Sequence, residues 1–284
     1  MKANFKKYIV GILSLSALIV LASCEQVIDW PVENDQIRLV VEGRITDELK
    51  VHQIKLTETA NYFNPAAPVP VENATVTVSD GSTTYTFTES SAGIYESNPF
   101  AGEAGKTYEL TITLATPLAN ETVFRATSTL LAAAQLDALV AINEEEEDEE
   151  GEIIEVTNLY FWGTGNLAVE NTYLMEVYVN ETLETDSIDK VTVFDDEFLT
   201  EEFEDFLFYQ IYEPAATVGD SITLVMHVVE KDFTEFYDQL LTESEPRDPF
   251  GLSSPPANVM GNISGSGLGY FYASSVTKVS TFVE

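Results

Sequence analysis

Residues 74–88 read ATVTVSDGSTTYTFT, and this stretch decides the fold class. On both sides of Asp80-Gly81, valine or aromatic residues alternate with threonine and serine. Alternation with a period of two is typical of a strand that buries one of its faces, and Asp-Gly between two such runs indicates a hairpin turn. The stretch therefore predicts two antiparallel strands joined by a tight turn.

Similar short segments occupy the rest of the N-terminal half. They are rich in valine, threonine and tyrosine, and no pattern of helical length interrupts them. They cover residues 37–42, 51–56, 74–78, 84–88, 108–114 and 122–127. About seven strands in this span predict a sandwich of immunoglobulin or transthyretin type over residues 37–128, without the disulfide of antibody domains.

The C-terminal half, residues 129–284, also reads mostly as strand, and its alternating or apolar runs cover residues 160–162, 173–179, 221–229 and 268–276. One helix is expected near residues 232–242, because Asp232 is a good N-cap and Glu235 follows three residues later. Its apolar residues have helical spacing: Phe233, Phe236, Tyr237, Leu240 and Leu241. The whole chain is thus predicted to be mainly β, with a C-terminal antiparallel β-rich domain that packs one helix.

The first 24 residues carry the features of an export signal. Three lysines precede an apolar run over residues 8–22 that is short for a membrane span, although a transmembrane anchor is the alternative. Ala22 and Ser23, directly before Cys24, resemble a bacterial lipobox. We expect residues 1–23 to be removed as a lipoprotein signal peptide, Cys24 to be lipidated, and residues 24–36 to form a tether.

Acidic residues dominate the charge of the chain, with 48 Asp and Glu against 13 Lys and Arg and a net charge of −35. Removal of the three signal-peptide lysines makes this −38. Such acidity excludes nucleic-acid binding, which needs a dense basic patch. The acids concentrate in two clusters. For residues 144–152 we expect a solvated, mobile loop or an interaction tail. For residues 195–205 an amphipathic helix and an irregular strand are the two alternatives. Weak calcium binding, a basic partner and a merely solvated surface are the alternatives for these clusters.

Groups suited to catalysis are scarce in this sequence. The only histidines are His52 and His227, and the only cysteine is Cys24. No Cys/His pair or zinc site can therefore form, and His227, which alternates with valines, is expected to be a satisfied sheet residue. We expect no enzyme activity, no cofactor and no metal site.

A glycine-rich stretch at residues 261–269 lacks the spacing of a dinucleotide or P-loop motif and precedes a strand. We interpret it as a loop that can contact a ligand or partner. The candidate contact residues are Gly265, Gly267, Tyr270 and Tyr272.

Several short stretches occur in an order that resembles a known family. They are LVVEGRITD at 39–47, PVENATVTV at 70–78, AGIY at 92–95, GKTYEL at 105–110 and NVMGNISGSGLGYF at 258–271. Together they resemble the Bacteroidota lipoprotein family catalogued as domain of unknown function 4249. The resemblance implies a lipid-anchored outer-membrane accessory protein, often encoded beside a TonB-dependent transporter, with no established catalytic residues.

From this resemblance we expect a non-enzymatic protein that assists such a transporter in ligand capture or uptake. Its lipidated Cys24 would hold it in the outer membrane, with the cell-surface side favoured over the periplasmic side. A surface hydrolase that uses paired carboxylates and a surface adhesin or spacer are the alternatives.

Overall fold

The computed structural model describes residues 36–60, 67–147, 151–165, 170–195, 202–211, 216–244 and 259–284. The expected signal peptide, Cys24 and nearly all of the tether lie outside these residues. Residues 37–284 form one compact unit. Within the described residues, no helix is long and apolar enough to span a membrane.

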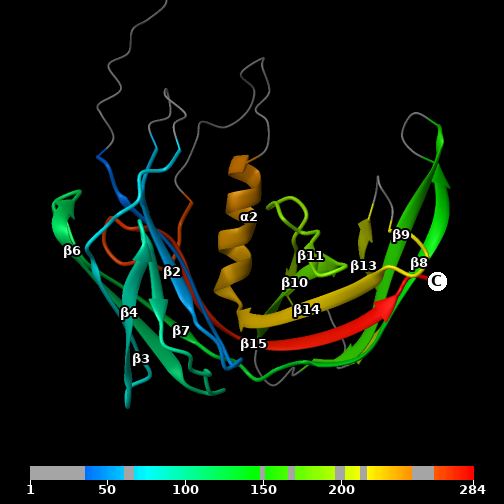
Figure 1. The fold of residues 1–284 in the computed structure, drawn as a ribbon, viewed down its shortest axis with the longest axis horizontal. Helices are drawn as coiled ribbons and strands as arrows, with labels where there is room; N and C mark the ends of the chain where they lie inside the picture. Colours follow the sequence, from blue (N-terminus) through cyan, green and yellow to red (C-terminus); the bar gives the residue numbers. More distant parts are fainter. Residues whose placement is uncertain are drawn as a thin grey trace, which may run out of the picture. The chain divides into compact units, whose positions relative to one another are not determined.

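In the described part of the N-terminal half there are seven strands, which confirms the predicted segments (Figure 1). They are β1 (Leu39–Thr46), β2 (Gln53–Glu58), β3 (Thr75–Ser79), β4 (Thr84–Ser91), β5 (Ile94–Ser97), β6 (Thr107–Leu118) and β7 (Glu121–Thr129). β3 and β4 form the predicted hairpin, and the Asp80 carboxylate closes its turn by accepting hydrogen bonds from the Ser82 and Thr83 amides. Gly81 takes a positive φ of 83° there, a conformation that glycine adopts at little cost.

The C-terminal half is also mainly β, and its helix lies where the spacing predicts it. The strands are β8 (Gln135–Glu147), β9 (Ile153–Thr164), β10 (Asn171–Val179), β11 (Thr182–Leu183), β12 (Thr192–Asp195), β13 (Glu202–Ile211), β14 (Ser221–Glu230) and β15 (Leu268–Phe282). The helix is α2 (Asp232–Ser244). Asp232 was predicted as the N-cap, which precedes the helix, whereas in the structure it is the first helical residue. Of the predicted apolar stripe, Phe233 and Tyr237 are buried.

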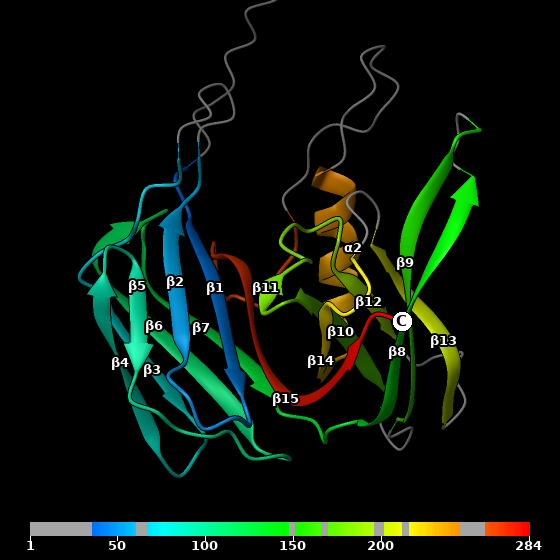
Figure 2. The same ribbon diagram turned by 45° about the vertical axis from the view of Figure 1, so that its right-hand side comes forward.

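One strand, β15, connects the two halves of the chain (Figure 2). Its first part pairs in parallel with β1, from Leu268 opposite Val40 to Ser274 opposite Thr46. Its second part pairs antiparallel with β14, from Ser275 to Phe282. The resulting sheet has the order β11-β10-β14-β15-β1-β2-β5-β4-β3-β6-β7, with β12 on β10, and a second sheet has the order β13-β9-β8. The boundary expected at residue 128 therefore falls inside a compact unit whose sheet continues from one half to the other.

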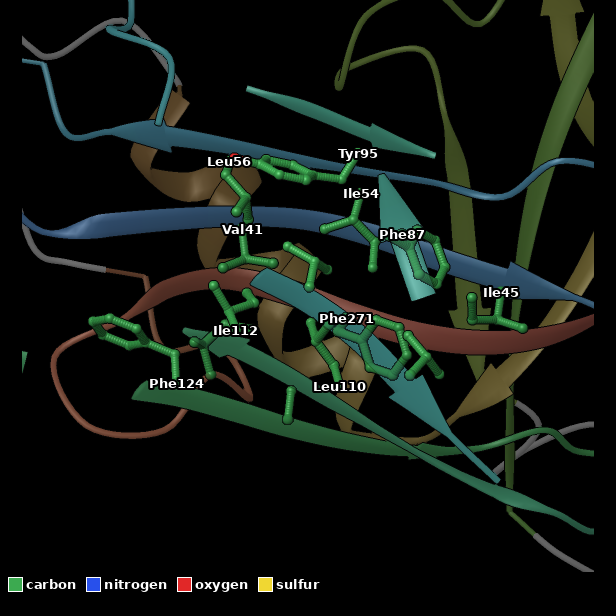
Figure 3. Close-up of a cluster of buried hydrophobic side chains, with 14 of the residues drawn as sticks. Val41, Ile45, Ile54, Leu56, Phe87, Tyr95, Leu110, Ile112, Phe124 and Phe271 are labelled. Carbon is green, nitrogen blue, oxygen red and sulfur yellow. The ribbon is translucent and has the colours of Figure 1, made fainter. Parts of the chain in front are cut away.

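The first core lies within the N-terminal sandwich but contains residues from the C-terminal end of the chain. Figure 3 shows Phe271 of β15 among Val41 of β1, Ile54 of β2 and Leu110 of β6. Phe271 and its neighbour Ala273 are fully buried in this core. The sandwich is thus observed, whereas its assignment to the immunoglobulin or transthyretin type stays a prediction.

Two further cores organise the C-terminal half. One face of β10 and β14 packs against β8, β9 and β13. This core contains Tyr173 and Met175 of β10, Met226 of β14, and Leu159 and Phe161 of β9. The opposite face of the same strands carries α2, whose Phe233 and Tyr237 pack with Leu174, Val229 and Tyr270. The predicted contact between the helix and one face of a sheet is therefore present.

The expectation of a mobile loop for the first acidic cluster is wrong for Glu144–Glu147, which end strand β8 and pair with β9. Alternation places Glu144 and Glu146 on one face of the sheet, where polar partners hold them. Asn158 Nδ2 donates to Glu144 Oε2 at 2.6 Å, and Gln210 Nε2 donates to Glu146 Oε1 at 2.9 Å. Residues 148–150 lie outside the described residues.

In the second acidic cluster, the described residues adopt the strand alternative. Asp195 ends β12, and residues 202–205 begin β13, which pairs with β9 through shifts in register. An irregular strand is therefore confirmed for residues 202–205, and residues 196–201 lie outside the described part of the chain.

Candidate functional site

Polar side chains from four strands meet on the face of the sheet that carries α2. Leu174, Val229 and Tyr270 pack against that helix. Glu176, His227 and Tyr272 each lie two residues from one of these three, on the same strands. Because side chains alternate between the faces of a sheet, they are on the same face as α2. Arg44 of β1 is the register partner of Tyr272. We call the following residues the Arg44 cluster: Arg44, Glu176, Tyr178, His227, Tyr272 and Ser274.

Glu176 is the centre of the Arg44 cluster, and its side chain is only 14% exposed. Arg44 Nη1 donates to Glu176 Oε1 at 2.7 Å, and the Tyr178 hydroxyl donates to Oε2 at 3.0 Å. Burial alone would raise the pKa of Glu176, but the polar His227 ring nearby and the charge of the Arg44 guanidinium outweigh burial and lower that pKa below its usual range. Glu176 is therefore ionised at neutral pH.

Arg44 brings the cluster to the surface, because 42% of its side chain is exposed. Its Nη1 donates a hydrogen bond to Glu176, and the Tyr272 hydroxyl lies beside the guanidinium. Burial would lower the pKa of Arg44, but Tyr272 and Glu176 together raise it above its usual value. Arg44 is thus a permanent positive charge that two neighbours hold in place.

His227 lies at the buried end of the cluster, with 2% of the residue exposed. Its Nδ1 shares a hydrogen bond of 3.0 Å with Ser274 Oγ. Its Nε2 is 3.8 Å from Glu176 Oε2 and has no hydrogen-bond partner. Burial lowers the pKa of His227 although Glu176 opposes this shift, so the imidazole is neutral at pH 7. The prediction of a sheet histidine is confirmed, but only one of its two ring nitrogens is satisfied.

Ser274, His227 and Glu176 supply the hydroxyl, imidazole and carboxylate of a hydrolytic triad, but their burial argues against that chemistry. A nucleophile must reach the carbonyl carbon of its substrate. Ser274 has no exposed surface in this fold, and the His227 Nε2 atom is also buried. These three residues therefore act as a structural network beneath Arg44.

A second set of charges lies at the turn that follows β1. Glu48 accepts hydrogen bonds from Lys50 Nζ at 2.7 Å and pairs with Lys278 Nζ at 2.6 Å. Burial would raise the pKa of Glu48, but its hydrogen bonds to Lys278 and Lys50 outweigh this and lower the pKa to about 2. Asp47 Oδ1 accepts a hydrogen bond from the Val276 amide at 3.0 Å, which fixes the turn to β15. Two basic residues of this acidic chain, Lys50 and Lys278, thus gather at the turn that follows β1.

The two glycines predicted as contact residues pack against β7, away from the Arg44 cluster. A Cβ atom on Gly265 would come within 2.0 Å of Glu121 Oε2, and one on Gly267 would come within 2.4 Å of Ile263. The Ser264 amide, in the same loop, donates to the Arg125 carbonyl at 2.7 Å. The glycines therefore permit close packing of this loop, and their role in contacting a ligand stays a prediction.

The two predicted tyrosines lie beside α2. The Tyr270 ring is buried 5.2 Å from the ring of Phe233, and the half-buried Tyr272 ring lies 5.1 Å from the same ring. Only Tyr272, of the four predicted contact residues, belongs to the Arg44 cluster. A contact of either tyrosine with a ligand or partner stays a prediction.

The sequence reasoning missed Arg44, Glu176 and Tyr178. One signal pointed to Glu176, because it is the only charged residue in the largely buried strand NTYLMEVYV. An isolated acid in such a strand needs a partner, since burial of an unpaired charge is costly. The identity of that partner depends on strand order, which no local pattern encodes.

Within the described residues, no group of three or more His, Cys, Asp or Glu side chains could hold a metal ion. The Arg44 cluster instead combines one exposed cation with a half-buried acid and two tyrosine hydroxyls. Such a set suits hydrogen bonding to a polar ligand.

These features define a mainly β protein, in which one curled sheet carries a helix and a charged cluster on the same face. The chain belongs to the family described as "Domain of unknown function (DUF4249)", whose model matches residues 25–280. This match confirms the resemblance to domain of unknown function 4249. No curated protein matches the chain.

Proposed function

We propose that the protein is a lipid-anchored outer-membrane accessory protein that assists a TonB-dependent transporter in ligand capture or uptake. One observation supports the lipid anchor, on which the rest of the proposal depends. The family match begins at residue 25, directly after the cysteine of the lipobox-like sequence. Processing before Cys24 would therefore yield a lipidated amino terminus followed at once by the family module. Acyl chains on Cys24 would supply lasting attachment, since more than one chain is needed for it.

The geometry of the Arg44 cluster supports binding rather than catalysis as the role of this module. The Ser274 hydroxyl, which would have to act as the nucleophile, is buried. The Arg44 cation is exposed, and it lies against Glu176 and Tyr272. Rigid, pre-oriented polar groups lower the entropic cost of recognising a ligand. We therefore propose that the protein is not an enzyme. As a separate part of the proposal, we expect it on the cell-surface side of the outer membrane.

Co-purification from the native membrane tests this function. The chain carries an affinity tag after Glu284 and is extracted with a mild detergent, and its partners are identified by mass spectrometry. We expect a TonB-dependent β-barrel in a near-stoichiometric amount. The physical reason is that a lipid anchor confines both proteins to one membrane, which raises their effective concentration.

The matched control replaces residues 1–24 with a secretory signal peptide that is cleaved but not lipidated. This version is expected to leave the membrane fraction and to recover much less of the barrel. Repeated recovery of the membrane-anchored chain without any transporter would refute the proposed partnership.

A further inference from the structure

Arg44 is held from within the sheet, yet part of its side chain faces solvent. Its Nη1 donates to Glu176 at 2.7 Å, the Tyr272 hydroxyl lies beside the guanidinium, and 42% of the side chain stays exposed. A guanidinium has five donor hydrogens in a planar fork, so the hydrogen bond to Glu176 leaves donors for a ligand. Its orientation is thus fixed before any ligand arrives.

The charges around Arg44 set the kind of ligand that fits. Glu176 offsets the charge of Arg44, while Lys50 and Lys278 offset Glu48. At physiological ionic strength the Debye length is about 8 Å, so the distant acids of the chain are screened. These five groups carry three positive and two negative charges, so an anion meets a local excess of one positive charge among them.

We propose that Arg44 binds the carboxylate group of a small-molecule ligand, such as a sugar acid. A planar carboxylate matches the guanidinium fork and accepts two parallel hydrogen bonds from it. Glu176 accepts a hydrogen bond from the guanidinium, and it remains ionised because the Arg44 charge attracts it. Tyr178, which donates a hydrogen bond to Glu176, and Tyr272, the register partner of Arg44, add hydroxyl groups to the same cluster.

Arg125 on β7 provides a matched comparison. Its side chain is 59% exposed, and its Nε lies 3.7 Å from Glu109 Oε1, beyond hydrogen-bond distance. Arg125 is therefore a cation of similar exposure without the fixed orientation of Arg44. If pre-orientation matters, only Arg44 will bind a carboxylate measurably.

Saturation-transfer NMR on the full chain in detergent micelles tests this inference, with glucuronate, acetate and glucose as probes at constant ionic strength. We expect saturable binding of glucuronate, weaker binding of acetate and none of glucose. Comparable binding of acetate and glucuronate would show that the bare carboxylate is the ligand and not the sugar acid. Arg44→Gln should weaken glucuronate binding about tenfold or more, because it removes a charge-assisted bidentate contact. Arg125→Gln should leave binding unchanged.

Arg44→Lys guards against a folding defect, because it keeps the charge beside Glu176 but lacks the fork. Thermal unfolding checks that each variant is folded, and the lysine variant should bind glucuronate several-fold more weakly. The absence of saturable glucuronate binding, equal binding by the folded Arg44 variants, or equal binding of glucose would overturn the inference. Binding at Arg44 needs no transporter, so this result and the co-purification can fail independently.

Discussion

A fragment that ends at Thr129 is expected to remain unfolded, although it contains all seven strands of the N-terminal sandwich. Its core lacks Phe271 and Ala273, which β15 inserts between the layers and which are fully buried in the intact chain. Loss of one buried phenylalanine side chain costs about 3–5 kcal/mol, and a domain has only about 5–15 kcal/mol in all. The fragment also loses the parallel partner of β1 along its register from Val40 to Thr46.

Circular dichroism and NMR of residues 37–129 beside residues 37–284 measure this effect. We expect poor dispersion and no cooperative unfolding transition for the fragment. The matched control joins residues 259–274 behind residue 129 through a flexible linker, because this segment restores Phe271 and the half of β15 that pairs with β1. A well-dispersed spectrum of the fragment alone would show that the N-terminal half is an autonomous domain.

Gly269→Ala is expected to unfold the chain or destabilise it far more than Gly105→Ala. Both glycines have nearly the same positive φ, 87° and 86°, so the backbone strain of an added Cβ is similar in the two variants. That strain costs about 1–2 kcal/mol. At Gly269, however, the new Cβ would lie 2.0 Å from the Val41 carbonyl oxygen, whereas at Gly105 it meets nothing within 4 Å.

The Val41 carbonyl cannot retreat easily, because β1 is paired with β15 on one side and with β2 on the other. Urea denaturation of both variants gives the two free energies of unfolding. We expect Gly105→Ala to lose about 1–2 kcal/mol. We expect Gly269→Ala to lose at least about 3 kcal/mol more, as overpacking against backbone does. Equal losses would mean that β1 and β15 are not as closely apposed as this fold requires.

Local elements of this fold are predictable from sequence because they depend on neighbouring residues. The β3–β4 hairpin follows from the alternation around Asp80-Gly81, and α2 follows from the spacing of Phe233 and Tyr237. The double pairing of β15 is different. The first part of β15 pairs with β1 and the second part pairs with β14, and neither partner is adjacent to β15 in the sequence. No local pattern encodes these pairings.

The same distinction explains what could be anticipated of the Arg44 cluster. His227 and Tyr272 stand out as single residues, and the lone acid in β10 signals that Glu176 needs a partner. Arg44 lies 132 positions from Glu176 in the sequence. The two side chains meet because the sheet order β10-β14-β15-β1 places their strands in one sheet, with only β14 and β15 between them. The acidic run at Glu144–Glu147 was misread for a related reason, since the amides that hold Glu144 and Glu146 come from β9 and β13.

Anchoring through Cys24 underlies the whole functional proposal, and mass spectrometry of the mature amino terminus tests it most directly. The chain is purified from the outer-membrane fraction, and its amino-terminal peptide is sequenced. The proposal predicts a peptide that begins at Cys24 and carries a diacylglyceryl thioether and an amide-linked acyl chain. A peptide in which Ser23 is still joined to an unmodified Cys24 would contradict it.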